Sequence, residues 1–170
     1  MPESSAPSRE TFIEMLNSRL PTKRAIAQGI LRNESGQILL CQLTYKKDWD
    51  LPGGVVDPQE SPAHCVEREV REELGLTVEA GRLIAVNWLP PYRGWDDAVL
   101  FLFDLGVVMS GAIDPDRFLA REIKGAHWVA PEDIGEHVAE YVARHVAVAL
   151  GAEHTAYLED GRPRGEGSGT

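Results

Sequence analysis

The sequence has few cysteines and no long apolar run. Cys41 and Cys65 are the two cysteines in 170 residues, and they form neither a Cys-x-x-Cys pair nor a cluster with zinc-ligand spacing. They predict two buried free thiols rather than a disulfide framework, and a reducing, cytoplasmic location. The longest strongly apolar stretches, such as residues 98–103, are far shorter than the ~20 residues that a membrane-spanning helix needs.

Positive charge is also scarce. The chain has 17 Lys plus Arg against 27 Asp plus Glu, which gives a formal net charge of −10 at pH 7. Nucleic-acid polymers and anionic membranes would be repelled by this charge, so we expect neither as a partner. The first ten residues have neither the basic nor the apolar region of a secretory signal, so no such signal is expected.

The length predicts a single domain, and 43% hydrophobic residues are enough for a core. Residues 1–8 are polar and contain prolines, which indicates a flexible arm. We expect the folded domain to span residues 9–151. Residues 152–170 are rich in glycine and charge and are expected to be a disordered tail.

Hydrophobic patterning predicts an α/β fold in which a mixed sheet lies between helices. Strands are expected at residues 25–32, 37–45, 82–89, 98–108 and 123–129. The segment 49–54, Trp-Asp-Leu-Pro-Gly-Gly, is expected to be a rigid loop that no central strand would tolerate.

Three helices are expected. The first follows Ser8 and carries an apolar face that could serve a homodimer, formed by Phe12, Met15, Leu16 and Leu20. The second begins after Ser61 with a proline in its first turn and ends at Gly75. The third spans residues 136–150.

The second helix carries an unusual group of carboxylates. At about 100° per residue, Glu69, Glu72 and Glu73 share an arc of about 100° that borders the apolar stripe of the helix. Like charges at these spacings destabilise a helix by about 0.2–0.5 kcal/mol per pair. Arg68 can pair with Glu72, but no residue of the helix neutralises Glu69 and Glu73. A hard divalent cation such as Mg2+ would do so, because it prefers oxygen ligands.

A second interpretation of the same helix is a solvated acidic face. The glycine-rich loop before the helix favours the metal site, because Gly53 and Gly54 allow a backbone carbonyl to approach closely.

Residues 54–76 resemble the Nudix hydrolase signature, G-x5-E-x7-R-E-U-x-E-E-x-G-U, in which U is a bulky aliphatic residue. Every fixed position is filled, by Gly54, Glu60, Arg68, Glu69, Val70, Glu72, Glu73, Gly75 and Leu76. The match covers about a seventh of the chain, and its fixed offsets make it specific. The resemblance implies a Nudix-type α/β/α sandwich.

The resemblance also implies hydrolysis of a diphosphate linkage in a nucleotide with Mg2+ or Mn2+. Glu69, Glu72, Glu73 and the Gly53 carbonyl would bind the metal. Gly54, Glu60 and Arg68 would support this box, the last two through an ion pair. The general base stays open between the box carboxylates and a downstream residue, for which Glu122 is the candidate.

The substrate is less well defined by the sequence. Pro91 lies 15 residues beyond Leu76, similar to the spacing in ADP-ribose pyrophosphatases, and Tyr92 and Trp95 could stack on a base or ribose. ADP-ribose or another nucleoside diphosphate sugar is therefore slightly favoured. The alternatives are a (d)NTP pyrophosphohydrolase and a non-catalytic module that senses a nucleotide.

Overall fold

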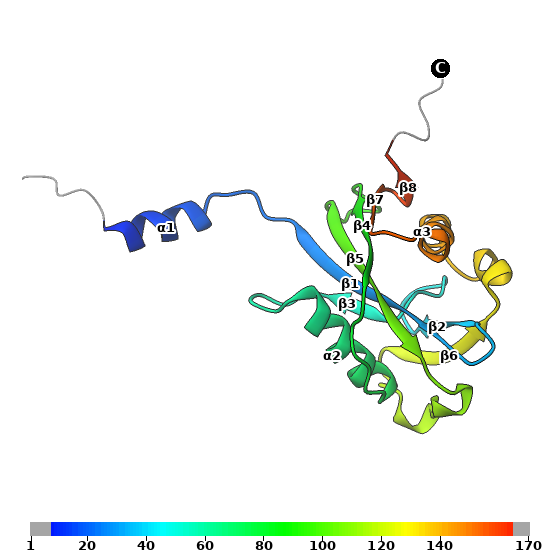
Figure 1. Ribbon diagram of the computed structural model, residues 1–170. Coiled ribbons are helices and arrows are strands. Elements are labelled where there is room, and N and C mark those ends of the chain that lie inside the picture. The colour runs from blue at the N-terminus through cyan, green and yellow to red at the C-terminus, as the bar shows by residue number, and fades with distance from the viewer. Residues whose placement is uncertain (1–7, 165–170) are drawn as a thin grey trace, which may run out of the picture.

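The computed structural model describes residues 8–164. A mixed β-sheet of eight strands runs in the order β6-β2-β1-β5-β4-β7-β8, and β3 pairs with β1 beside this path (Figure 1). The strands are β1 (Arg24–Arg32), β2 (Ile38–Leu43), β3 (Gly53–Val55), β4 (Leu83–Leu89), β5 (Ala98–Val107), β6 (Ile123–Val129), β7 (Ala156–Glu159) and β8 (Arg162–Pro163). The helices are α1 (Arg9–Asn17), α2 (Pro62–Leu74) and α3 (Glu140–Gly151), with 3-10 turns at Ser110–Ala112, Pro115–Arg117 and Pro131–Glu136.

Helices α2 and α3 cover opposite faces of the sheet, so the expected α/β/α sandwich is confirmed (Figure 1). The core has two parts, one on each face of the sheet, because successive side chains of a strand point to opposite faces. Ile30 packs on the α3 side and Leu31 on the α2 side. Leu40 and Cys41 divide in the same way, and both cysteines are buried and free.

Helix α2 begins and ends at the expected residues. The Ser61 hydroxyl accepts from the His64 N–H at 3.2 Å, and Pro62 occupies the first turn. Gly75 closes the helix in the left-handed region with φ of 66°, where a residue without Cβ is least strained. These caps set where the carboxylates of α2 lie along the sheet.

The glycine loop and the third helix differ from the expectation. Gly53–Val55 forms the short strand β3, which pairs antiparallel with β1 through Ile26, Ala27 and Gln28. Residues 136–139 do not belong to α3, because the His137 carbonyl accepts from the Trp49 N–H at 2.8 Å and Val138 bridges to Trp49. The α-helix therefore begins at Glu140.

The expected disordered tail is wrong for the residues that form β7 and β8. Strand β7 lies parallel to β4, and β8 turns back on β7. The Gly161 N–H donates to the Oδ1 of buried Asn87 at 3.1 Å, which fastens this segment to the core. The folded domain therefore extends to residue 163. The expected arm, apart from Ser8, and the last six residues of the tail lie outside the described residues.

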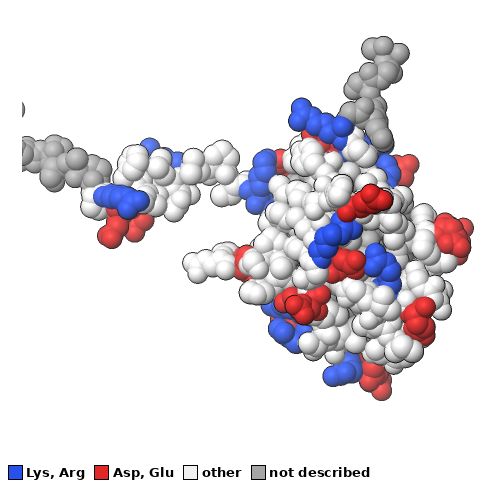
Figure 2. Space-filling view, in the orientation of Figure 1, with Lys and Arg blue, Asp and Glu red and all other residues white. Residues whose placement is uncertain are grey.

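Helix α1 buries none of its residues, and Figure 1 shows it standing clear of the sheet. Acidic and basic side chains lie side by side on the face of the molecule drawn in Figure 2, and they form no extended basic patch there. Over residues 8–164, no helix combines the length and hydrophobicity needed to cross a membrane.

Candidate active site

Arg68 joins the loop before α2 to the helix itself. Its Nε donates to Glu60 Oε1 at 2.8 Å and its Nη2 to Glu60 Oε2 at 3.0 Å, so the pair is bidentate. These bonds lower the pKa of Glu60 to about 2. Glu60 also accepts from the Asp57 N–H at 3.1 Å, which orders the turn before the helix. The ion pair that the resemblance implies between Glu60 and Arg68 is therefore present, and their supporting role in catalysis stays a prediction.

Glu69 and Glu73 lie against the two glycines of β3. The Gly53 N–H points at Glu73 Oε2 at 3.4 Å. A Cβ on Gly54 would lie 2.6 Å from Glu69 Oε1, so the missing side chain leaves room for this carboxylate. Helix α2 and strand β3 thus bring Gly53, Gly54, Glu69 and Glu73 together as predicted.

Burial and mutual repulsion disfavour the charged forms of Glu69 and Glu73. Glu73 is 5% exposed, and burial, followed by the neighbouring Glu69 carboxylate, raises its pKa to about 8. Burial also raises the pKa of Glu69, although Arg68 acts in the opposite direction. Two crowded carboxylates of this kind would be stabilised by a cation.

Glu72 and Glu122 lie at the edges of the group. The Glu72 side chain is 51% exposed and accepts from Arg68 Nη1 at 3.3 Å. Glu122 precedes β6, and its charge raises the pKa of both Glu69 and Glu73. Glu122 is therefore within electrostatic range of these two carboxylates, and its role as a general base stays a prediction.

The residues fit a hard divalent cation by their chemistry. Carboxylates of α2 and backbone carbonyls of β3 are oxygen donors of the kind that Mg2+ and Mn2+ prefer. Within the described part of the chain, no three His, Cys, Asp or Glu side chains are already arranged to hold a metal ion. Arg68 forms ion pairs with both Glu69 and Glu72, so these two carboxylates are directed at its guanidinium.

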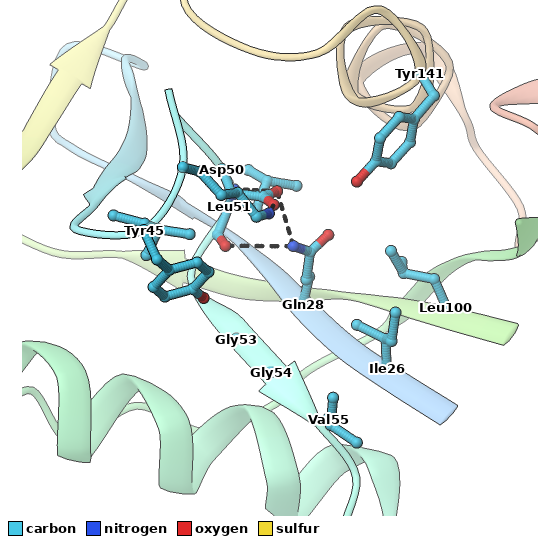
Figure 3. Close-up of a pocket in the computed structure, with 12 residues that line it drawn as sticks. Ile26, Gln28, Tyr45, Asp50, Leu51, Gly53, Gly54, Val55, Leu100 and Tyr141 are labelled. Carbon is cyan, nitrogen blue, oxygen red and sulfur yellow. Dashed lines mark hydrogen bonds and ion pairs between the residues drawn. The ribbon is translucent and has the colours of Figure 1, made fainter. Parts of the chain in front are cut away.

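A pocket opens on the other side of Gly53 and Gly54 from α2 (Figure 3). Its volume is about 130 Å³, and it lies between β1, β3, the loop before β3 and α3. Its polar side chains come from segments far apart in the sequence: Gln28, Tyr45, Lys46, Asp50 and Tyr141. Sequence reasoning did not identify them as site residues: Asp50 lies in the segment 49–54 that is expected to be a loop, and the others belong to no local motif.

Pro91, Tyr92 and Trp95 do not line this pocket. Tyr92 and Trp95 are 56% and 64% exposed, and they close a turn through reciprocal backbone hydrogen bonds at 3.0 and 2.9 Å. The Arg24 guanidinium lies over the Trp95 ring, 4.6 Å from its centroid. Tyr92 is close enough to contribute to the raised pKa of Tyr141, after burial and Asp50. The loop therefore does not form the wall of the pocket.

Comparison with known proteins agrees with the fold and the box. A family model described as the NUDIX domain matches residues 22–149. A "MutT-like protein" of Streptomyces ambofaciens is 29% identical over 143 residues, which cover 84% of this chain and 87% of that protein. A "Putative 8-oxo-dGTP diphosphatase" of Bacillus subtilis (strain 168) is 37% identical over 102 residues, or 60% of this chain and 63% of that protein.

Among solved structures, an ADP-ribose pyrophosphatase from Streptococcus suis 89-1591 is 26% identical, covers 81% of this chain and 99% of its own, and superposes with a TM-score of 0.58. The fold and these relatives define a hydrolase of diphosphate linkages. The chain belongs to the Nudix family. Members of this family typically use a divalent metal ion and act on small nucleotides.

Proposed function

We propose that this Nudix hydrolase uses Mg2+ or Mn2+ to cleave the diphosphate linkage of a nucleoside diphosphate derivative. The observation that carries the proposal is the convergence of Glu69 and Glu73 on Gly53 and Gly54, directly beside the pocket. In the proposed arrangement, the diphosphate lies at the glycines and the nucleoside occupies the pocket.

The proposed metal ligands are Glu69, Glu72, Glu73 and the Gly53 carbonyl. A bound divalent cation would neutralise the phosphoryl oxygens and lower the pKa of a bound water. The protein's own contribution is to hold the carboxylates in place. Arg68 pairs with Glu60 and contacts Glu69, so the loop and helix that carry the ligands are joined.

The proposed general base is one of the carboxylates at this site, and Glu122 stays a candidate alongside the box residues. Its position supports this role, because its charge acts on Glu69 and Glu73. Its side chain is 38% exposed and pairs with Arg121 at 3.0 Å. A carboxylate in this setting can accept a proton and pass it to solvent.

Two substrate classes are proposed. ADP-ribose or another nucleoside diphosphate sugar is supported by the Pro91 spacing and by the similarity to the Streptococcus suis ADP-ribose pyrophosphatase. A (d)NTP is supported by the relative named as a putative 8-oxo-dGTP diphosphatase. A role as a non-catalytic nucleotide sensor has no support, since every box carboxylate is present.

Homodimerisation through α1 stays a prediction. Helix α1 ends at Asn17, so Leu20 follows the helix instead of lying on it. Phe12, Met15, Leu16 and Leu20 are all exposed, so they are available to contact a second molecule. A helix of this length is marginal in isolation and gains most of its stability from packing. These facts support an interaction of α1 with a second copy.

The proposal is tested by hydrolysis assays on a substrate panel and by a Glu73→Gln variant. The panel contains ADP-ribose, nucleoside diphosphate sugars, dinucleoside polyphosphates and (d)NTPs with Mg2+ or Mn2+, and phosphate is measured after phosphatase treatment. Glu73→Gln keeps the side-chain shape and removes its charge, so we expect turnover to fall by about 100-fold or more while the fold is retained.

Glu67→Gln is the matched control on the same helix. Glu67 Oε1 accepts from the Ala80 N–H at 2.8 Å, and a glutamine keeps this acceptor. Near-normal turnover is expected for this control. Unchanged turnover in Glu73→Gln would contradict the metal-site assignment, and no turnover of any compound by the unaltered protein would contradict the function.

A further inference from the structure

Gln28 is a buried amide at the base of the pocket. It lies on β1, is 7% exposed, and lines the cavity together with Asp50 and Leu51 (Figure 3). Its Nε2 donates to Asp50 Oδ1 at 2.9 Å and points at the Leu51 carbonyl at 3.4 Å. Both partners are acceptors, so the group facing them must be the NH2 of the amide.

Both carboxylate oxygens of Asp50 receive donors. Its Oδ1 also accepts from the Leu51 N–H at 2.9 Å, and its Oδ2 pairs with the Lys46 ammonium. Three donors are thus directed at the two oxygens of this carboxylate, so it presents acceptor atoms to Gln28. The Gln28 amide therefore has one orientation, because turning it over would set its oxygen against two acceptors.

The locked orientation leaves Gln28 Oε1 facing the cavity. Figure 3 shows this oxygen directed away from Asp50 and Leu51, toward the space below Tyr141. No donor from residues 8–164 bonds to it. Because this acceptor opens onto the cavity and no donor of the described residues is in place, a ligand that supplies a donor there would gain a hydrogen bond.

The rest of the pocket suits a flat heteroaromatic ring. Ile26 and Leu100 give an apolar floor beside Gln28 (Figure 3). The Tyr141 hydroxyl points into the same space from α3, and burial raises its pKa to about 12, so it stays protonated and can donate. An apolar floor with an acceptor and a donor at its edge is the arrangement that recognises a nucleobase by its hydrogen-bonding edge.

We propose that Gln28 is a specificity-determining residue whose Oε1 accepts a hydrogen bond from an N–H group on the base of the nucleotide. The inference rests on the proposed function for its ligand class. It goes further by naming the chemical group that the base must carry. Asp50 and Lys46 serve this selection by holding the amide in its single orientation.

The test measures the binding of nucleoside 5′-monophosphates to the full-length protein by calorimetry or ligand-observed NMR, without metal. AMP, GMP, CMP and UMP identify the preferred base. Two donor-free analogues follow: purine riboside 5′-monophosphate for the purines and pyrimidin-2-one riboside 5′-monophosphate for the pyrimidines. We expect the unaltered protein to bind the donor-free analogue about 10-fold more weakly than the preferred natural nucleotide.

Gln28→Met removes the acceptor and keeps the approximate length of the side chain. In this variant we expect the natural nucleotide and its donor-free analogue to bind equally, at the strength with which the unaltered protein binds the analogue. Gln42→Met is the matched control on β2, outside the pocket, and it should keep the 10-fold preference. The comparison of the two ligands on the unaltered protein stands even if Gln28→Met fails to fold.

Equal binding of natural and donor-free nucleotides by the unaltered protein would overturn the inference, as would a preference that survives Gln28→Met. Failure of all four monophosphates to bind while hydrolysis persists would overturn it too, and would leave the proposed function standing. The opposite result, base selection by Gln28 without any hydrolysis, would contradict the proposed function alone.

Discussion

At the scale of single residues, Arg68 is the centre of the box. Its guanidinium contacts four carboxylates, with the bidentate pair to Glu60 as the best-aligned contact. The fork of N–H donors lets one side chain brace Glu60 while it holds Glu69 and Glu72. Arg68 therefore both orders the loop and offsets part of the negative charge of α2.

Replacement of Arg68 by lysine keeps the positive charge and removes the two-pronged geometry, so it tests whether stability and activity depend on that geometry. A single ammonium cannot make two parallel bonds to Glu60, so we expect Arg68→Lys to lose about 1–2 kcal/mol of unfolding free energy and about 10-fold or more of kcat/KM. Urea unfolding and initial rates measure the two effects. Arg71→Lys, on an exposed position of the same helix, is the control, and identical behaviour of the two variants would contradict the role given to Arg68.

At the scale of elements, the two neighbouring glycines of β3 are needed for different reasons, Gly53 for the strand backbone and Gly54 for the position of a box carboxylate. Gly53 has φ of 137°, and a Cβ there would lie 2.1 Å from the Ala27 carbonyl oxygen. The backbone of β1 cannot yield to it. A Cβ on Gly54 would instead meet the end of the Glu69 side chain, which can rotate away.

Substitution by alanine should therefore mainly lower the activity at Gly54 and mainly lower the unfolding free energy at Gly53. We expect Gly54→Ala to displace the Glu69 carboxylate and lower kcat by about 10-fold or more, with less than about 1 kcal/mol change in unfolding free energy. Gly53→Ala should cost more than about 2 kcal/mol of unfolding free energy. Thermal unfolding and hydrolysis assays on both variants check this, and a stability loss of equal size in the two would refute the distinction.

The elements also explain how far the sequence could predict this protein. Helix α2 was predicted to its caps, because Ser61, Pro62 and Gly75 are local signals. Strands β3 and β7 were missed, since three or four residues carry no period and their pairing to β1 and β4 decides their conformation. The box carboxylates were predicted from one helix face, whereas Gln28, Asp50 and Tyr141 meet only in the folded chain.

At the scale of the whole molecule, a buried polar contact holds three parts of the chain together. Asn87 on β4 lies 3.3 Å from His145 Nδ1 on α3, and its other end receives the Gly161 N–H. Both side chains are at most 1% exposed. Burial lowers the pKa of His145 to about 4, so the imidazole is neutral in the folded protein and can accept from the amide.

This histidine should make stability depend on pH. Its folded pKa of about 4 lies below the unfolded value of 6.5, so the unfolded chain binds more protons between these values. Its contribution is fully present above pH 6.5 and is lost as pH falls toward 4, up to about 3 kcal/mol. Urea unfolding at pH 7.5, 5.5 and 4.5 measures the slope.

The variant His145→Gln keeps an acceptor for Asn87 without a titrating ring, and its slope between pH 6.5 and 4 should be smaller than that of the unaltered protein. His64→Gln alters an exposed histidine of α2 and should leave the slope unchanged. Equal slopes in all three proteins would rule out His145 as the source.

The strand pairing of β7 has a consequence for self-association. By lying beside β4, β7 satisfies backbone groups that would otherwise form an open sheet edge over Leu83–Leu89. Beyond it lies only the two-residue β8, too short to template another chain. Removal of the residues after Gly151 would uncover an apolar edge strand, of the kind that recruits further strands into aggregates. The C-terminal hairpin thus covers the edge of the sheet that β4 would otherwise present to another molecule.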